Sequence, residues 1–562
     1  MCAWLLGLSS VPLRPPLTPR LTKGAVIPTE QRRLLPLRSG GIAAPPQPPL
    51  ALMFRLLLHP STLALLHSFT PTLLLLFPSA YTFPIAMKPR ALLLSALLLI
   101  PVFWHHHIEA GDLGSHVYNA WLAQLVQKGT APGVYSVWQW KNILFDLLLL
   151  SLSNLFGICA AEKIAVAFCV LLFFWSVFAL IAVATRRPPW FLTPFLGMLA
   201  YGYVFHMGFM NYYLSIALAC LGLSLVWTGR PKLQLASLPL IPLMLLAHPL
   251  GAFWFLAAAA YLLLWQHLPR WRLAFPILGL ILILAVRWLI THHSSYEVEW
   301  PDHPFYFFNG ADQFVVFGER YRYISAIVLA FGLLMAGLNL RRAPRSSSWW
   351  KDRLLLLEFC VIAFCVTSLL PEDLNFNLGT GWIGLIVSRL TLITAIYVLC
   401  FLGSFTPRKW HLVALSACAL LFFVFLYQDT SLIARLEANA ERLTRSLPFG
   451  THVLKTVAAP ADWRVPFIYH SIDRACIGHC FAFSNYEAST KQFRLRVHEG
   501  SPVVVFDPDD SESMESGEYE VQPEDLPLKQ IDQCDPADPT ALCLRDLSPH
   551  EINGRLSHRP NF

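Results

Sequence analysis

The sequence predicts an all-α polytopic membrane protein with about eleven transmembrane helices, an outward helix in its first loop, and a small extracytoplasmic C-terminal α/β domain. The first observation is composition: the 562 residues are 55% hydrophobic and 14% charged, with a mean hydropathy of +0.51. The second is the recurrence of apolar runs near the roughly 20 residues that a helix needs to cross a bilayer. The third is a regular alternation of basic and acidic loops between those runs.

Residues 1–86 differ from the rest of the chain. Residues 1–52 are rich in Pro and Arg and have no amphipathic period, which is typical of disorder. Residues 60–83 are apolar, but three prolines interrupt them. A short basic tip then follows Met87 and leads into ALLLSALLLIPVFW, as at an ordinary bacterial start. We expect translation to begin at Met87 and residues 1–86 to be a disordered or mis-annotated extension; a targeting or anchoring segment is the alternative.

The predicted membrane domain covers residues 87–428. Its candidate spans are 89–108, 161–184, 190–207, 210–228, 234–248, 250–267, 273–291, 323–340, 353–371, 382–402 and 411–428. The run 142–157 is apolar but short, which favours a re-entrant or interfacial helix.

The loops between these spans differ in charge. One set carries Lys88, Arg90, Arg186, Arg187, Arg230, Lys232, Arg270, Arg272, Arg341, Arg342, Arg345, Lys351, Arg353, Arg408 and Lys409. The other set carries Glu109, Asp112, Glu297, Glu299, Asp302, Asp312, Glu319, Glu372 and Asp373. Because basic loops stay in the cytoplasm, we expect a multi-pass protein of the bacterial inner membrane with its C-terminal domain outside.

The predicted C-terminal domain, residues 429–562, is soluble in composition. It begins with a predicted helix at 431–447, followed by a strand-like run at 501–508 and a loose acidic stretch at 507–525. It holds four cysteines, Cys476, Cys480, Cys534 and Cys543. An even number in an extracytoplasmic domain predicts two disulfides with three possible connectivities. A zinc site that combines the CIGHC cysteines with His479 is the alternative.

A polar segment, GDLGSHVYNAWLAQLVQKGTAPGVY, directly follows the first span. Acidic groups at a membrane tend to mark functional sites. On a helix, Asp112 and His116 would share one face. The carboxylate of Asp112 is therefore a candidate general base for an acceptor hydroxyl, or a ligand of a divalent cation together with His116. The alternative is that Asp112 caps the following helix.

The layout of this region resembles the membrane glycosyltransferases of the GT-C fold, such as the dolichyl-phosphate-mannose-protein mannosyltransferases. The resemblance rests on a first span, an outward loop with Asp112 and then His116, a helix, and the ending Gly129-Thr-Ala-Pro132-Gly-Val-Tyr135. It covers roughly residues 87–428. It implies transfer of a sugar from a polyprenyl-phosphate carrier to an outward glycan, lipid or protein acceptor, with Asp112 as the catalytic base or a residue beside it.

The chain departs from the family in a later outward loop, where many members have a second acidic pair. The loop HMGFMNYYLS offers His206 and Asn211 but no carboxylate. Glu297, Glu299 and Asp302 are acids of another loop that nothing in the spacing ties to the site. We therefore predict no metal and no cofactor, with a divalent cation as the alternative.

A lipid-phosphate donor needs cationic or hydrogen-bonding partners near the outer interface. Arg389 lies inside an apolar span, near its outward end, where an arginine faces a cavity or snorkels. Arg320 and Arg322 begin another span, and His248 ends one. We predict that these four residues and His116 bind the substrate. Interfacial placement of the arginines and helix termination at His248 are the alternatives.

The histidine triplet at 105–107 is followed by Glu109, a combination typical of metal ligands. Neighbouring histidines on one helix point in different directions, so we expect them to anchor the chain at the interface.

The sequence contains no Walker loop, GxGxxG, HExxH or GxSxG motif in a credible context. We therefore expect membrane lipids and a polyprenyl-phosphate-linked sugar as partners, and no nucleic acid. Two other function classes stay open. One is a transporter or flippase for a lipid-linked or small solute, although no internal repeat supports it. The other is a non-catalytic membrane protein of envelope assembly.

Overall fold

The fold is described from a computed structural model. It describes residues 88–272, 274–292, 296–300, 309–342, 347–376, 381–466, 468, 470–535 and 537–554. All of them belong to one compact unit of the chain, 48–562. The predicted N-terminal extension, 1–86, and Asp302 lie outside the described residues.

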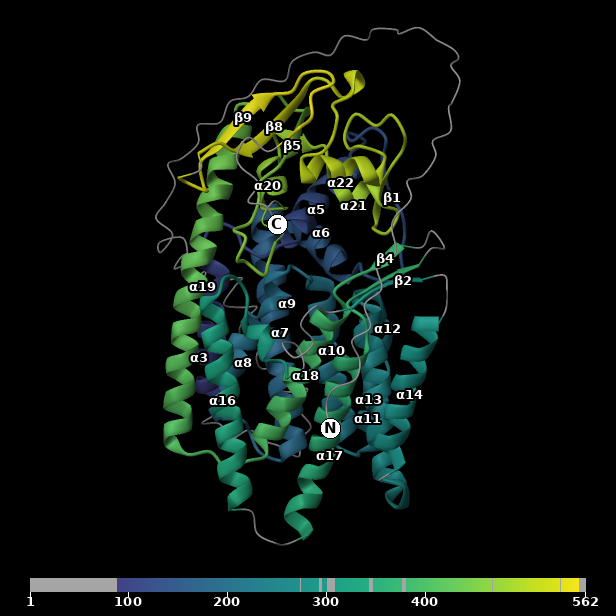
Figure 1. Ribbon diagram of the computed structural model, residues 1–562, viewed down its shortest axis with the longest axis vertical. Helices are drawn as coiled ribbons and strands as arrows, with labels where there is room; N and C mark the ends of the chain where they lie inside the picture. The colour runs from purple at the N-terminus through teal and green to yellow at the C-terminus, as the bar shows by residue number, and fades with distance from the viewer. Residues whose placement is uncertain are drawn as a thin grey trace, which may run out of the picture. The chain divides into compact units, whose positions relative to one another are not determined.

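Long apolar helices dominate the structure (Figure 1). Among the described residues, seven are long and apolar enough to cross a membrane: α7 (Ile158–Thr185), α10 (Met210–Trp227), α13 (Pro249–His267), α14 (Ala274–His292), α16 (Arg320–Arg341), α18 (Ile386–Gly403) and α19 (Lys409–Thr444). A further helix, α17 (Ser347–Leu369), packs against α14 and α18.

Helix α14 presents apolar side chains outward along its whole length. No residue of this helix is buried, and Ile277, Leu278 and Leu282 are 60%, 62% and 63% exposed. Leaving large aliphatic side chains in water costs roughly 1.5–3 kcal/mol each, whereas lipid tails accept them. The chain is therefore a multi-pass membrane protein.

Three of the predicted spans are interrupted in the structure. The span predicted at 89–108 consists of α3 (Lys88–Leu98) and α4 (Ile100–Phe103). The span predicted at 190–207 consists of η3 (Trp190–Leu192), α8 (Thr193–Ala200) and α9 (Tyr203–His206). The span predicted at 234–248 consists of α11 (Pro231–Ser237) and α12 (Leu240–Ala247). Pro101 and Pro239 lack the N–H that a continuous helix requires. At Gly202 the backbone is extended, and a Cβ there would lie 2.7 Å from the carbonyl oxygen of Gln313.

The polar segment after the first span forms α5 (Leu113–Gln127), as predicted, and most of this helix is buried. It packs against α6 (Leu144–Phe156) and α20 (His470–Ala475). Its polar residues Ser115, His116 and Asn119 are buried along with its apolar ones. A helix that is covered all round belongs to a core, so α5 lies inside the junction between the helical part and the C-terminal part.

Helix α19 extends well beyond the predicted end of the last span. It continues without interruption through residues 428 and 429 to Thr444. The predicted domain boundary therefore falls inside one helix, and most of the helix predicted at 431–447 is the end of α19.

The C-terminal region, residues 445–554, is built around a small four-stranded sheet. Its strand order is β6 (Cys480–Ala482), β5 (Thr451–Lys455), β8 (Leu528–Gln533) and β9 (Leu542–Asp546). Strand β5 runs parallel to β6 and β8, whereas β8 and β9 are antiparallel. The helices of this region are α20, α21 (Tyr486–Ser489) and α22 (Pro508–Ser516).

Two predictions for this region were wrong. Residues 501–508 form bends instead of a strand, although Val503, Val504 and Val505 are buried as expected of an apolar run. The start of the acidic stretch is ordered as α22, because Asp507 caps the helix by accepting from the backbone N–H of Asp509, and a proline follows at the first position.

Two smaller sheets join segments that are distant in sequence. Strand β1 (Val134–Ser136), at the end of the first loop, pairs with β7 (Leu495–Val497) of the C-terminal region. The aromatic ring of Tyr135 stacks on that of His498, with centroids 4.3 Å apart. The other sheet contains β2 (Tyr296–Glu299), β3 (Asp373–Phe376) and β4 (Gly381–Ile383).

The four cysteines of the C-terminal region form two local disulfides, Cys476–Cys480 and Cys534–Cys543. The CIGHC sulfurs are therefore bonded to each other, and the zinc site that would use both as thiolates with His479 is not formed.

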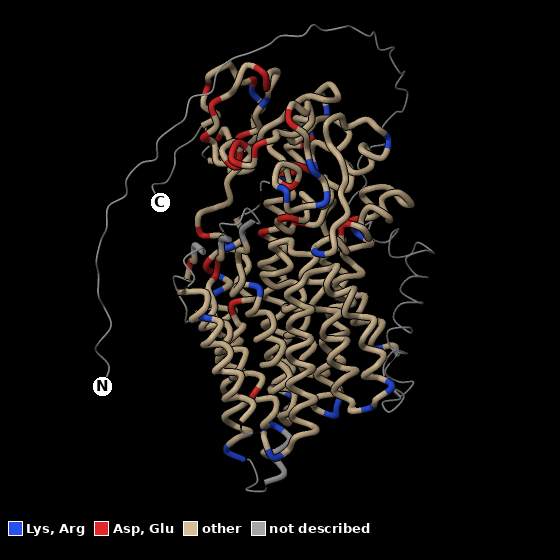
Figure 2. The backbone as a smooth tube through the Cα atoms, turned by 90° about the vertical axis from the view of Figure 1, so that its right-hand side faces the viewer, with Lys and Arg blue, Asp and Glu red and all other residues tan. Residues whose placement is uncertain are grey.

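Charge is distributed unevenly along the helices (Figure 2). Lys and Arg gather at the helix ends that lie away from the sheets. Most of the Asp and Glu lie at the opposite end and in the C-terminal region. The alternation of charge along the sequence thus becomes a separation in space.

Candidate functional site

Asp112 occupies the N-cap position of α5, but its side chain makes no capping hydrogen bond. Its backbone N–H donates to the carbonyl of Met207 at 3.1 Å, and a Cβ on Gly208 would lie 2.4 Å from its nitrogen. The loop that begins α10 therefore holds this backbone in place. The carboxylate is left for other partners, which disfavours the capping interpretation.

The first partner of Asp112 comes from the C-terminal region. His470 Nε2 lies 3.5 Å from Asp112 Oδ1, and His470 Nδ1 lies 3.3 Å from Asp473 Oδ2. Asp473 is in turn paired with the buried amine of Lys455. Burial raises the pKa of Asp112 above its ordinary value, while the charges of His470, His116 and Arg389 oppose this rise. Asp112 is thus a carboxylate of increased basicity beside an imidazole.

His116 lies on the same face of α5 and has two acidic neighbours. Its Nδ1 is 2.7 Å from Asp146 Oδ1 and 3.8 Å from Glu487 Oε1. Burial alone would lower the pKa of His116, but the charge and hydrogen bond of Asp146 raise it to about 10. Burial raises the pKa of Glu487 to about 7, against the positive charge of His116. His116 is therefore a cation at neutral pH.

The HMGFMNYYLS loop takes part without supplying an acid. Asn211 donates to Asp146 Oδ2 at 2.8 Å and accepts from the backbone N–H of Phe145 at 2.8 Å. His206 Nδ1 lies 3.0 Å from the carbonyl oxygen of Glu109. The carboxylates that accompany Asp112 come instead from the first turn of α6 and from α21. We call Asp112, His116, Asp146, His470 and Glu487 the Asp112 cluster.

Arg389 is an arginine whose charge reaches this cluster. It lies in the first turn of α18, and its positive charge acts on Asp112. Its Nη1 donates to the carbonyl of Gly384 at 2.6 Å, and its guanidinium carbon lies 4.2 Å from the ring centroid of Phe209. Its Nε has no partner, and Arg389 forms no ion pair with any residue that the structure describes. A guanidinium without a carboxylate partner can receive an anion.

His248 ends one helix and caps the next. Its Nδ1 accepts from the backbone N–H of Leu250 at 3.2 Å, which makes it the N-cap of α13. Its ring lies edge-on to Tyr212, with centroids 5.3 Å apart, and the Tyr212 hydroxyl donates to the carbonyl of Arg389 at 2.7 Å. The geometry therefore favours the helix-terminating interpretation of His248 and gives it an indirect link to Arg389.

The structure directs Arg320 and Arg322 elsewhere. Arg320 pairs with Asp429 and donates to Gln428 Oε1 at 2.7 Å, so it joins α16 to α19. Arg322 Nη1 lies 2.8 Å from Glu319 Oε1 on an exposed surface. These contacts engage Arg320 with α19 and Arg322 with the start of its own helix, and the prediction that they bind the substrate finds no support in the geometry.

A second buried cluster lies near the first. Arg474 of α20 pairs with Glu109 at 3.3 Å, with Glu162 at 2.8 Å and with Glu437 at 2.8 Å. All four side chains are only 1% exposed. This Arg474 cluster connects the first loop, α7 and α19 to the C-terminal region. Its guanidinium forms an ion pair with each of the three carboxylates.

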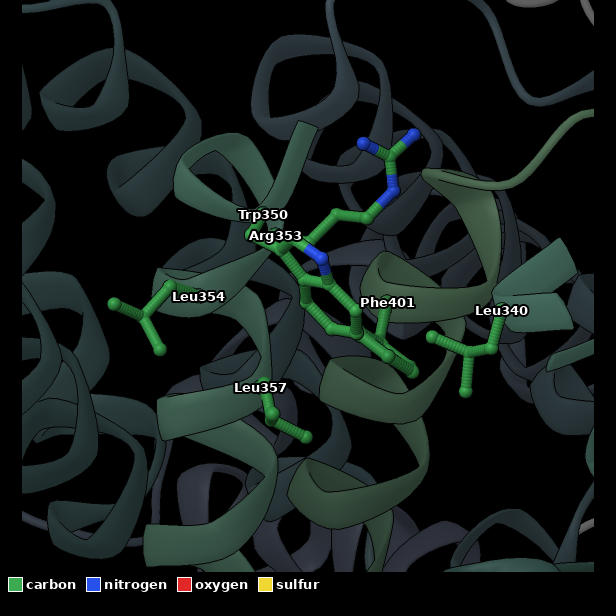
Figure 3. Close-up of a pocket in the computed structure, with 6 residues that line it drawn as sticks. All are labelled: Leu340, Trp350, Arg353, Leu354, Leu357 and Phe401. Carbon is green, nitrogen blue, oxygen red and sulfur yellow. The ribbon is translucent and has the colours of Figure 1, made fainter. Parts of the chain in front are cut away.

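One cavity has no carboxylate or histidine among its described lining residues. It has a volume of about 120 Å³ and is lined by five apolar side chains and Arg353 (Figure 3). The guanidinium of Arg353 donates to the carbonyl of Ser404 at 2.7 Å. With no acid, base or nucleophile in its lining, this cavity offers no chemistry.

Reasoning from sequence pointed to Asp112, His116 and Arg389, which the structure brings together. It missed Asp146, although an acid in the short apolar run 142–157 is a usable signal. It also missed His470 and Glu487, which reach the cluster only through the docking of the C-terminal region. The carbonyl oxygen of Glu299 accepts from the backbone N–H of Glu372 at 2.9 Å, and neither residue belongs to the Asp112 cluster.

Comparison with known proteins adds no relative: no family model, no curated protein and no solved structure matches the chain. Any functional conclusion therefore depends on the residues of the site.

Proposed function

We propose that the protein is a membrane glycosyltransferase of the GT-C type, which moves a sugar from a polyprenyl-phosphate donor to an extracytoplasmic glycan, lipid or protein acceptor. The observation that carries the proposal is that a candidate base, Asp112, lies near a candidate anion-binding group, Arg389. The carboxylate of Asp112, whose pKa is raised, is under the influence of the positive charge of Arg389, an arginine without an ion-pair partner among the described residues. Sugar transfer from a lipid phosphate requires a base and an anion-binding cation.

In the proposed reaction, the acceptor hydroxyl oxygen attacks the anomeric carbon of the donor sugar. The bond from that carbon to the phosphate oxygen breaks, and the polyprenyl phosphate leaves with the bonding electrons. Asp112 takes the hydroxyl proton, and Arg389 neutralises the leaving phosphate. His470, 3.5 Å from Asp112, positions the carboxylate. No metal is needed for this balance.

We place the Asp112 cluster on the extracytoplasmic side. The supporting observation is that the Lys- and Arg-rich loops gather at the opposite helix ends (Figure 2). A site on that side suits a donor that arrives already activated on a lipid. The full set of about eleven spans, and residence in the bacterial inner membrane, belong to the same proposal.

The test uses membranes that contain the full-length protein, incubated with labelled polyprenyl-phosphate hexoses and pentoses. We expect Asp112→Asn to lower transfer by about 100- to 10,000-fold, the usual contribution of a general base. Because burial disfavours the ionised form of Asp112, the neutral amide should leave thermal stability in detergent unchanged or raised.

The matched control is Asp546→Asn, which changes an Asp that is 78% exposed and paired with Lys529. This variant should transfer at the wild-type rate. Wild-type turnover in Asp112→Asn would contradict the proposal. Movement of a labelled lipid across sealed vesicles, with no transfer, would favour the transporter alternative.

A further inference from the structure

A second group of side chains with metal-binding chemistry lies apart from the Asp112 cluster. His106, His107 and Glu441 each bring one ligand atom within 4.8 Å of those of the other two. Two of these residues follow α4 and the third lies near the end of α19. The trio therefore links the first loop to the helix that leads into the C-terminal region.

The histidine triplet does not adopt the helical geometry on which its sequence interpretation depended. Residues 104–107 form bends after α4 ends at Phe103. The rings of His106 and His107 lie 4.3 Å apart between centroids, at 88° to each other. His105 instead places its Nε2 2.9 Å from the hydroxyl of Thr430. Outside a helix, two adjacent histidines can converge on one point.

The trio opens onto a cavity of about 190 Å³. Glu162, Arg474, Cys159 and His479 also line this cavity. A volume of this size has room for an ion together with water or another ligand. The trio is thus a built site with a space beside it, as opposed to a set of surface side chains that happen to be close.

Metal-binding histidines usually hydrogen-bond a carboxylate or carbonyl through the ring nitrogen that does not bind the ion, and His107 has such a partner. His107 Nδ1 lies 3.2 Å from Glu162 Oε2, and Glu162 is held by Arg474. A carboxylate behind a histidine orients its ring toward the ion. His107 Nε2, on the opposite side of the ring, is 2.8 Å from Glu441 Oε1. That nitrogen and that oxygen are the atoms that would face a shared cation.

We propose that His106, His107 and Glu441 bind one divalent transition-metal ion, with Zn²⁺ as the ion that best suits two imidazoles and a carboxylate. Three protein ligands leave a coordination position open toward the cavity. The ion clamps α19 to the first loop. This inference does not depend on the transferase proposal, because the metal site shares no residue with the Asp112 cluster.

The experiment uses full-length protein purified through a histidine-free affinity tag, stripped with EDTA and then titrated with Zn²⁺ against a chromophoric chelator. Co²⁺ is added in parallel to read the absorption bands of a cation bound to nitrogen and oxygen. We expect one ion per chain and at least a tenfold loss of affinity in His106→Ala and in Glu441→Gln. His106 is exposed, so its removal leaves the fold intact.

The matched control is His105→Ala, which removes a neighbouring histidine that is bonded to Thr430 and lies outside the trio. It should keep the wild-type affinity. The proposal is overturned if the wild-type protein binds no stoichiometric ion, or if His106→Ala binds as tightly as His105→Ala.

Discussion

Two buried polar clusters join the first loop to the C-terminal region, and they differ in how their charged side chains are paired and exposed. In the Arg474 cluster one cation meets three carboxylates, and every side chain is 1% exposed. In the Asp112 cluster the carboxylate of Asp112 is 19% exposed, and its ion-pair partner among the described residues is a histidine, His470, at 3.5 Å. Paired charges away from water hold a structure together, whereas a partly exposed carboxylate near an arginine that has no ion-pair partner among the described residues suits the proposed transfer.

The largest expected effect is on stability, in the Arg474 cluster. Arg474→Met removes the guanidinium from three buried carboxylates; Glu162 keeps His107 as a partner, whereas Glu109 and Glu437 lose their ion pairs with Arg474. Breaking a buried ion pair from one side costs about 3–5 kcal/mol, so we expect severe loss of folded protein. Thermal unfolding and yield in detergent measure it. Unchanged thermal stability would mean that the two clusters do not differ in the way described.

The close contact between α5 of the first loop and α20 of the C-terminal region can be tested at a single glycine, Gly114. A Cβ on Gly114 would lie 2.2 Å from the carbonyl oxygen of His470, so Gly114→Ala must separate α5 from α20. We expect lower thermal stability, by about 1–3 kcal/mol as for other overpacked sites, and lost transfer. The control is Gly337→Ala in α16, where an added Cβ would meet no described heavy atom outside its own stretch of helix within 4 Å. This variant should be neutral or slightly stabilising. Equal behaviour of the two variants would contradict the close approach.

The Asp112 cluster should also give the protein a pH-dependent stability. The pKa of Glu487 is raised to about 7 in the folded protein from an ordinary 4.5. The folded state therefore binds more protons than the unfolded state between these values, and stability falls as pH rises from about 4.5 to 7. Thermal unfolding at pH 5, 6 and 7 should show this slope in the wild type and a flatter one in Glu487→Gln. Identical slopes would show that Glu487 is not buried beside His116 and Asp146.

The smallest effect is expected at Arg322, which sequence reasoning had placed near the donor phosphate. Its ion pair with Glu319 is 55% and 56% exposed, and exposed pairs contribute about 0–1 kcal/mol. Arg322→Gln should therefore change thermal stability and transfer little. A large loss of transfer in this variant would restore Arg322 to the site and weaken the distinction between it and Arg389.

Much of the fold follows from local sequence signals. Apolar runs of the right length predicted α7, α10, α13, α14 and α16 within a few residues. The interrupted spans were harder, because a helix break at Gly202 depends on the close approach of Gln313 from another part of the chain. The course of α19 was also missed, since the change from apolar to polar composition near residue 428 marks a change of surroundings and not the end of a helix.

The candidate site was predictable only in part, for the same reason. Asp112 and His116 share a helix face, which spacing alone reveals. The position of His470 or Glu487 depends on how the C-terminal region docks, and no local pattern encodes that. The grouping of His106 and His107 with Glu441 was not foreseen, because the helical geometry assumed for the histidines does not occur there and because Glu441, not Glu109, is the acid that lies beside them.

Because α19 is uninterrupted, the number of residues in this helix sets the rotation and the height at which the C-terminal region is held. Its 36 residues extend about 54 Å at 1.5 Å per residue, from the apolar part of the molecule to the sheet. One residue more or fewer in its middle would turn everything beyond by about 100° and shift it by about 1.5 Å. His470 would then no longer meet Asp112. The length of this one helix therefore determines whether His470 and Asp112 lie side by side.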